Sequence, residues 1–404
     1  MQQPAPSESP ALAGIRVLDL THFESGTSCC ETLAWLGADV IKVEPPGAGE
    51  QGRRATADRE DADSWYFLML NANKRSIQLD LRDENGKAIM RRLLKTADIL
   101  VENLAPGAIE RLGFGFDDVR AINPRVVYGS IKGYRRGSPF EEYLSFDPIG
   151  QSVGGAVSVT GETGGRPVKP GPTYADTGTG LHLTIGLLAA LHQRERTGTG
   201  QRVEVSMQDA IINCSRISYA EQLRTGVAAG RYGNRSPMPT HPSDLFPCAP
   251  EGPNDYCFIY TSRANNVQWE VLLDVIGHPE LKSDPRFGSP AARRESAEAV
   301  NDLVSSWTRQ HAKHQVMRLL GSAGVPAGAV LDTVELSGDE FLRECGMFVE
   351  VDHPVRGRYV MPAWPVQMSE SYVPVAAPPV LGAHTQEVLA SLDELEQRDV
   401  EVGR

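Results

Sequence analysis

The sequence lacks an excess of positive charge and has no long hydrophobic run. Lys and Arg number 40 against 52 Asp and Glu, which gives a formal net charge of −12. Without a basic stripe to neutralise phosphates, we expect no nucleic-acid partner. The longest apolar stretch, residues 181–191, is interrupted by His182 and Thr184 and is too short to span a bilayer. No basic segment followed by an apolar one opens the chain, so we expect a cytoplasmic protein without a membrane partner.

The cysteines and histidines show no pattern of a disulfide framework or a metal site. Six cysteines are present without CxxC spacing, and we expect them to be reduced, partly buried thiols. The histidines are scattered, and the single pair with helical ligand spacing, His311 and His314, is more typical of a solvated helix face. The sequence therefore predicts no bound metal.

Glycine-rich nucleotide motifs and the serine-hydrolase motif are also missing. The turn after the first predicted strand, residues 22–29 (HFESGTSC), has one glycine where a dinucleotide site needs GxGxxG. Neither a Walker A motif nor GxSxG is found. These absences argue against an NAD-dependent dehydrogenase, a P-loop NTPase and a serine hydrolase.

What is present is an alternation of short β-branched runs with longer helical segments up to about residue 207. With 404 residues, 41% hydrophobic and 23% charged, the chain is typical of a globular protein with two domains, or one large domain with an insertion. The alternation predicts an α/β fold with a mostly parallel, doubly wound sheet. The six predicted strands are Ile15–Leu20, Asp39–Glu44, Ser76–Leu81, Asp98–Glu102, Val126–Ile131 and Arg202–Ser206.

The composition changes after residue 220. Residues 226–256 are rich in Gly, Pro, Asn and Ser, which indicates a linker or an active-site loop. A smaller α+β unit is expected to follow, with one apolar strand, Tyr256–Thr261. Its predicted helices are 267–276, 296–310 and 314–323. A proline-rich stretch begins at residue 334, and a helix is predicted at Thr385–Leu395.

Asp176 stands in a Gly- and Thr-rich segment, residues 172–180 (PTYADTGTG), immediately before an apolar run with helical spacing. An acidic residue in a turn at that place can cap the helix, bind a cation, or act as a nucleophile with small residues leaving room for a substrate. Capping is the commonest of the three, and the residues alone leave all three open.

Three polar side chains follow predicted strands. Lys132 ends a strand and precedes a glycine, at the edge where open α/β sheets bind ligands. A lysine extending to solvent is the ordinary alternative. Asn103 and Arg111 follow another strand, and helix capping and surface pairing are their usual roles.

Several segments together resemble one family, the class III CoA-transferases (CaiB/BaiF type), over nearly the whole chain. Within that family, the formyl-CoA:oxalate CoA-transferases are the most similar members we can name. Besides Asp176 and the helix after it, the resemblance rests on GIRVLDLTH (14–22), LGADVIKVEPPG (36–47), NKRSIQLDL (73–81), VENLAPG (101–107), GTGQRVEVSMQDA (198–210), GVPAGAV (324–330) and LGAHTQEVL (381–389).

The resemblance implies a fold that periodicity does not reveal. Family members are interlocked homodimers in which each subunit is threaded through a ring formed by the other. It implies a Rossmann-like large domain built by the first and last parts of the chain and a small α+β domain between them. We accordingly expect a large-domain part at residues 11–225, a linker and small domain at 226–333, and a return segment at 334–404.

The resemblance also implies an activity. Asp176 matches the family's catalytic aspartate, which carries CoA as an aspartyl thioester between a donor acyl-CoA and an acceptor acid. The expected substrates are a short acyl-CoA (formyl-, acetyl- or succinyl-CoA) and a small carboxylic acid such as oxalate, with no cofactor. The backbone N–H groups of a Gly178/Gly180 turn are expected to stabilise the oxyanions.

The other site residues are carried over by position. Glu24 lies where formyl-CoA:oxalate enzymes have a glutamine, and an ionised Glu24 would raise the pKa of Asp176. The residues implied to contact substrate or CoA are His22, Asn103, Arg111, Lys132, Tyr134 and Gly178. The chain departs from the pattern at Pro45, where the family has a CoA-binding arginine. A second departure is the lack of a glycine-rich loop between residues 255 and 267.

Two alternative functions remain open. A 2-methylacyl-CoA racemase or acyl-CoA isomerase needs a proton-exchanging pair, but the racemase histidine aligns with Phe146 in the segment 145–148 (SFDP). Phe146 cannot exchange protons, which argues against that reading. A catalytically silent CoA-binding protein would bind the ligand without forming an adduct on Asp176.

Overall fold

The computed structural model describes residues 7–236, 241–262 and 264–401. The chain divides into two compact units, of which the first comprises residues 1–157, 169–226 and 340–404 and the second residues 158–168 and 227–339. Two compact units within one chain are not by themselves independent domains. The domain boundaries expected from the sequence therefore stay a prediction.

A six-stranded parallel sheet forms the centre of the first unit, as predicted. Its strand order is β3-β2-β1-β4-β5-β6, so the connection reverses direction between β1 and β4. In such sheets, ligands bind at the carboxyl ends of the strands beside this reversal. The strands are β1 (Arg16–Leu20), β2 (Asp39–Glu44), β3 (Arg75–Gln78), β4 (Ile99–Glu102), β5 (Val127–Lys132) and β6 (Arg202–Ser206).

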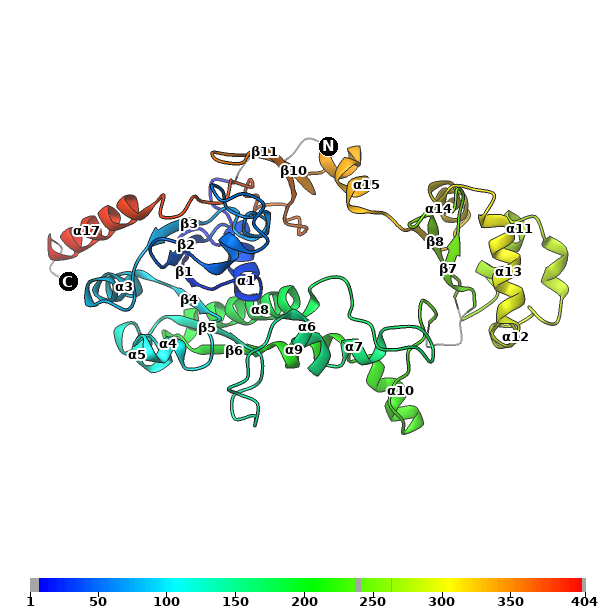
Figure 1. Ribbon diagram of the computed structural model, residues 1–404, viewed down its shortest axis with the longest axis horizontal. Coiled ribbons are helices and arrows are strands. Elements are labelled where there is room, and N and C mark those ends of the chain that lie inside the picture. The colour runs from blue at the N-terminus through cyan, green and yellow to red at the C-terminus, as the bar shows by residue number, and fades with distance from the viewer. Residues whose placement is uncertain (1–6, 237–240, 263, 402–404) are drawn as a thin grey trace. The chain divides into compact units, whose positions relative to one another are not determined.

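Helices cover both faces of this sheet because its strands are apolar on both sides (Figure 1). In β1, Leu18 packs with one helical layer and its neighbour Val17 with the other, as the two-residue repeat of a strand requires. One layer contains α3 (Glu84–Thr96), α5 (Phe116–Ile122) and α17 (Thr385–Glu401), and the other contains α1 (Ser25–Trp35), α8 (Tyr174–Thr197) and α9 (Met207–Cys214).

The remaining elements of the first unit are short. A hairpin of β10 (Phe348–His353) and β11 (Gly357–Pro362) lies in its last segment. The other helices are η1 (Gln51–Arg54), α2 (Trp65–Leu68), α4 (Ala108–Arg111), α6 (Asp147–Val153), α10 (Ser218–Thr225) and α16 (Glu340–Glu344), and α7 (Ala156–Val159) lies where the chain passes between units.

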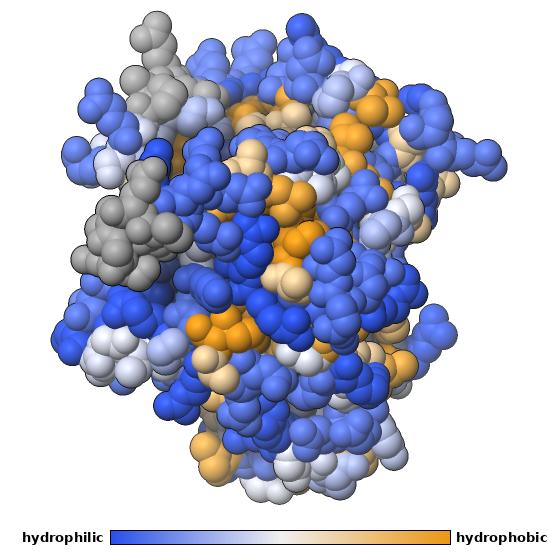
Figure 2. Space-filling model, turned by 90° about the vertical axis from the view of Figure 1, so that its left-hand side faces the viewer, coloured by the Kyte–Doolittle hydropathy of each residue, from blue (hydrophilic) through white to orange (hydrophobic). Residues whose placement is uncertain are grey.

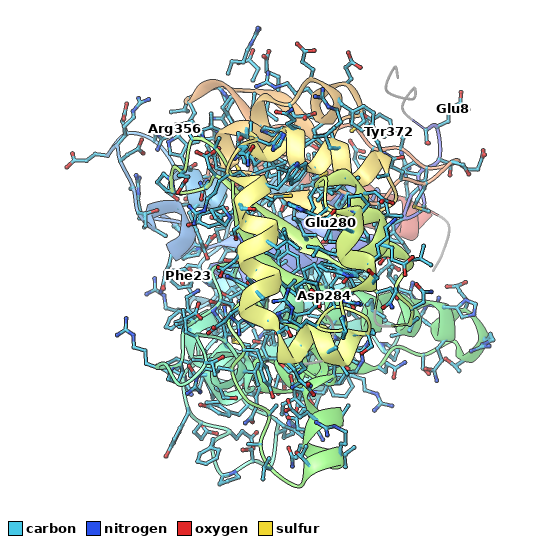
Figure 3. The ribbon with its side chains drawn as sticks, turned by 90° about the vertical axis from the view of Figure 1, so that its right-hand side faces the viewer. Glu8, Phe23, Glu280, Asp284, Arg356 and Tyr372 are labelled. Atoms are coloured by element: carbon cyan, nitrogen blue, oxygen red, sulfur yellow. The ribbon has the colours of Figure 1, made fainter. Side chains whose placement is uncertain are left out.

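The second unit is an α+β structure around a three-stranded antiparallel sheet, with the order β7-β8-β9. Its strands are β7 (Ser243–Pro247), β8 (Tyr256–Tyr260) and β9 (Ala327–Ala329). Its helices are α11 (Val267–Val275), η2 (Pro279–Ser283), α12 (Pro290–Glu295), α13 (Ala297–Thr308), α14 (Lys313–Ser322) and α15 (Thr333–Gly338). Figure 3 labels Glu280 and Asp284, which lie on η2 and at its end.

The prediction of a single strand in this unit was wrong, as was the prediction of a continuous loop over residues 226–256. β7 lies within that segment and pairs with β8 from Ser243 to Pro247. Few apolar residues mark β7, and it ends in a proline, so its alternation is too weak to detect. Its stability comes from pairing with β8 and from the burial of Phe246 in the core of the unit.

Gly178 and Gly180 lie inside α8, so the glycine turn expected before this helix is also wrong. Gly180 is required by a close approach between helices. A Cβ at this position would lie 2.5 Å from the carbonyl oxygen of Ser25 and 3.2 Å from the backbone nitrogen of Cys29, both on α1. A Cβ on Gly178 would meet no atom within 4 Å.

The surface of the first unit on the side of α3 and α17 is predominantly hydrophilic (Figure 2). Within this surface, Arg92 of α3 forms ion pairs with Asp393 and Glu396 of α17.

All six cysteines are free thiols, and four of them are buried. Among the described residues, none of the helices combines the length and the apolar character needed to cross a membrane.

The two glycines of α8 provide a matched test of this packing. Gly180→Ala should lower the stability by roughly 1–3 kcal/mol, because the added methyl group forces α1 and α8 apart. Gly178→Ala should be neutral or stabilising by up to about 1 kcal/mol, because alanine favours the helix and the methyl group meets open space. Denaturant midpoints of both variants measure the difference, and equal midpoints would contradict the close contact.

Candidate active site

A buried ionic cluster holds the carboxyl end of β1. The Asp19 carboxylate is fully buried and lies 3.0 Å from Nζ of Lys74 and 3.7 Å from Nζ of Lys42. It also accepts hydrogen bonds from the backbone N–H and the hydroxyl of Thr21. Burial alone would raise the pKa of Asp19, but the two ammonium groups and these hydrogen bonds lower it to about 2. The start of the β1–α1 loop is therefore fixed by charge as well as by packing.

The rest of this loop is fixed by side chains from the segments that follow two neighbouring strands, β4 and β2. Asn103, after β4, accepts from the N–H of His22 and donates to its carbonyl, both at 2.8 Å. Glu50 accepts from the N–H of Phe23 at 3.2 Å. Phe23, labelled in Figure 3, has a φ of +57°, a conformation that non-glycine residues seldom adopt. The loop thus presents its next residue, Glu24, in one defined position.

The first turn of α8 contacts Glu24 and forms the other side of the candidate site. Asp147 of α6 is buried and accepts from the N–H of Ala175 at 3.1 Å. Glu24 is also buried, and its Oε1 accepts from the hydroxyls of Thr173 and Thr177, the latter at 2.7 Å. Two carboxylates therefore already occupy donors at the positive end of α8.

Asp176 lies in the same turn, between the two threonines, and lines a cavity of ≈ 440 Å³ in the first unit. Its carboxylate has no hydrogen-bond partner among the described residues. The N-cap is Thr173, so Asp176 does not have the capping role, which was one of the three roles left open by the sequence. Burial, together with the charges of Glu24 and Asp147, raises the pKa of Asp176 to about 7. An uncommitted carboxyl that ionises near neutrality is suited to nucleophilic or acid–base chemistry.

The structure brings five of the predicted site residues together around this cavity: His22, Glu24, Asn103, Lys132 and Asp176.

Lys132, one of those five, is neither free nor extended to solvent. Its Nζ donates to both carboxylate oxygens of Glu102, at 2.9 and 2.7 Å, and to the carbonyl of Leu104 at 2.8 Å. Glu102 is almost completely buried at the end of β4. The lysine therefore ties β5 to β4 and neutralises a buried acid.

The other three predicted residues do not line the cavity. Tyr134 lines a neighbouring cavity of ≈ 220 Å³, which Lys132 also borders. Arg111 is exposed at the end of α4. The carbonyl of Gly178 accepts from Nδ1 of His182 within α8.

Sequence reasoning missed the two threonines that hold Glu24. Thr173 and Thr177 are four residues apart, so they lie on one face of a helix on either side of Asp176. That spacing was a usable signal once the helix was known to begin at Tyr174. Asp147 was likewise recognised only as part of a segment, not as a residue of the site.

The chain matches the family model described as CoA-transferase family III over residues 12–385. It is 42% identical to the formyl-CoA:oxalate CoA-transferase of Streptomyces coelicolor, covering 94% of each chain, and 40% identical to that of a Bradyrhizobium species, covering 94% and 92%.

Solved structures give the same result. A CAIB/BAIF family protein from Brucella suis has a TM-score of 0.84 at 30% identity, covering 95% of this chain and 100% of that one. Rv3272 from Mycobacterium tuberculosis has a TM-score of 0.78 at 29% identity, covering 95% and 99%. The chain belongs to CoA-transferase family III and is a class III CoA-transferase.

Proposed function

We propose that this enzyme moves CoA from a short acyl-CoA to a small carboxylic acid through an aspartyl-CoA thioester on Asp176. The observation that carries the proposal is the Asp176 carboxylate, which lines the cavity without a hydrogen-bond partner among the described residues. The relatives that act on formyl-CoA and oxalate support a short acyl donor and a small acid acceptor. Formyl-, acetyl- and succinyl-CoA are the candidate donors.

Each bond formed in the transfer is matched by a bond broken, so the reaction needs no cofactor. A carboxylate oxygen of Asp176 attacks the thioester carbon of the donor, the C–S bond breaks, and CoA leaves as a thiolate from a mixed anhydride. The thiolate attacks the Asp176 carbonyl, which releases the donor acid and forms the aspartyl thioester. The acceptor carboxylate then attacks that thioester, and the released thiolate attacks the acceptor carbonyl of the second anhydride. The new acyl-CoA departs and Asp176 is a carboxylate again.

The oxyanions of these steps need hydrogen-bond donors. The N–H groups of Gly178 and Gly180 lie within the helix α8 and are unsuited to this role. The first N–H groups of α1, beginning at Ser25, have no acceptor within their own helix, and Ser25 lines the cavity. We assign them the oxyanion role in place of the glycines.

The proton-transfer alternative lacks a histidine at the position that aligns with the racemase histidine, which is Phe146 here. Phe146 packs edge-on against Phe23, with ring centroids 5.7 Å apart, at the place where a racemase needs a histidine. A phenyl ring exchanges no proton, so the geometry favours transfer over racemisation.

The proposal includes the interlocked homodimer implied by the family resemblance. Large apolar side chains on the first unit are exposed in the single chain, among them Ile185 (67%), Ile217 (66%) and Leu223 (87%). An interface between two copies of the chain would bury side chains of this kind, and a second copy is the partner that the family resemblance implies.

Replacing the nucleophile tests the mechanism. Asp176→Asn should reduce transfer by at least about 10³-fold, which corresponds to roughly 4 kcal/mol, while CoA binding changes little. Initial rates and calorimetric titration with CoA measure the two effects. Asp117→Asn, which removes an exposed acid on α5, serves as the control and should leave both unchanged. Substantial CoA transfer by the Asp176→Asn variant would contradict the mechanism.

The raised pKa of Asp176 predicts the pH dependence of the first half-reaction. Only the ionised carboxylate attacks, so aspartyl-CoA formation should fall about tenfold per pH unit below pH 7 and level off above it. Glu24→Gln removes one nearby negative charge, which lowers this pKa and should shift the fall to lower pH. Single-turnover rates from about pH 5 to 9 measure the profile. A flat profile, or a shift to higher pH in Glu24→Gln, is the contrary result.

A further inference from the structure

The cavity beside Asp176 contains no uncompensated positive charge among the described residues that line it. Its one lysine, Lys132, is neutralised by Glu102 at 2.7 Å. Burial lowers the pKa of His22, so its imidazole is neutral near pH 7. Two acidic side chains, Glu24 and Asp176, face the same space. The polar part of the cavity is therefore negative.

Glu24 is held in place by hydrogen bonds to one of its two carboxylate oxygens. Both threonine hydroxyls of α8 donate to Oε1, and Oε2 has no hydrogen-bond partner among the described residues. The side chain is buried and anchored from two positions, so it cannot turn away to relieve repulsion. A substrate that enters the cavity therefore meets a fixed acceptor.

Apolar side chains form much of the remaining wall. Phe23 and Phe146 contact each other, and Leu104, Tyr143 and Leu144 line the same cavity. Phe146 and Leu144 are 55% and 67% exposed, so they present apolar surface at the cavity. A substrate body that matches this wall is a short hydrocarbon chain.

We propose that Glu24 determines which acid accepts CoA, selecting a monocarboxylic acid whose short apolar body carries a hydroxyl group and discriminating against dicarboxylates. This inference rests on the proposed function and narrows its acceptor. Once Asp176 carries CoA it is neutral, and Glu24 is the acidic side chain that still lines the cavity. A hydroxyl donates a charge-assisted hydrogen bond to Oε2. A second carboxylate meets this acid, and the described residues that line the cavity supply no unpaired cation to offset the repulsion.

The acceptor half-reaction tests this selection with three acids of equal carbon number: 3-hydroxybutyrate, butyrate and succinate, with oxalate as a fourth. The aspartyl-CoA form is prepared from acetyl-CoA, and its mass is confirmed before any acid is added. The quantity compared is kcat/KM for each acid. The wild-type enzyme should prefer 3-hydroxybutyrate to succinate and to oxalate by at least about tenfold.

Substitution of Glu24 should abolish that preference. In Glu24→Gln, the ratio of 3-hydroxybutyrate to succinate should fall about tenfold or more, because the amide no longer repels a carboxylate. Glu142→Gln removes an exposed acid that lines the neighbouring cavity and should leave the ratio unchanged. Thr177→Val, which removes one hydroxyl that anchors Glu24, should reduce the ratio, and Thr177→Ser should restore it.

The outcomes separate this inference from the function on which it rests. If no acyl-CoA yields an adduct on Asp176, the proposed function fails and this inference with it. If the adduct forms but succinate or oxalate reacts as well as 3-hydroxybutyrate, the selection by Glu24 is overturned and the function stands. A preference that survives in a folded Glu24→Gln overturns it equally.

Discussion

The buried ion pair between Asp19 and Lys74, with Lys42 beside it, is the constraint on which the site depends. These groups lie at the carboxyl end of β1, inside the protein, where an unpaired charge would be costly. Lys42 also donates to the carbonyl of Thr21 at 2.9 Å, so the same cluster fixes the first residue of the following loop. Asn103 and Glu50 continue the restraint through His22 and Phe23. These contacts position Glu24 against α8. None of them involves the Asp176 carboxylate.

The meeting of three acidic side chains at one helix terminus explains the state of Asp176. The positive end of α8 and its hydroxyls favour negative charge, but Asp147 and Glu24 occupy the Ala175 N–H and the two threonine hydroxyls. The Asp176 carboxylate is repelled by both neighbours and has no hydrogen-bond partner among the described residues. Its carboxylate is therefore less stabilised than an ordinary one. Acylation removes the negative charge of the Asp176 carboxylate, and with it the repulsion by Glu24 and Asp147.

The sequence predicted the sheet well because each of its strands is a short β-branched run between helical segments, as at Val17 and Val40. It also indicated the edge of the sheet at which His22, Asn103 and Lys132 meet. It could not show that Lys132 forms an ion pair with Glu102, because the two residues lie on different strands and are 30 positions apart in the sequence. Gly180 was interpreted as a turn residue, although its role is to let two helices touch. β7 was missed because its stability comes from its partner strand.

Locating the thioester tests the central claim most directly. The enzyme is incubated with an acyl-CoA, quenched in acid and digested, and the peptides are mapped by mass spectrometry. The account predicts CoA attached to the peptide that contains Asp176, with fragment ions that place the added mass on that residue and its loss on treatment with hydroxylamine. An adduct on Glu24 instead, or transfer to an acceptor acid without any adduct, would contradict it.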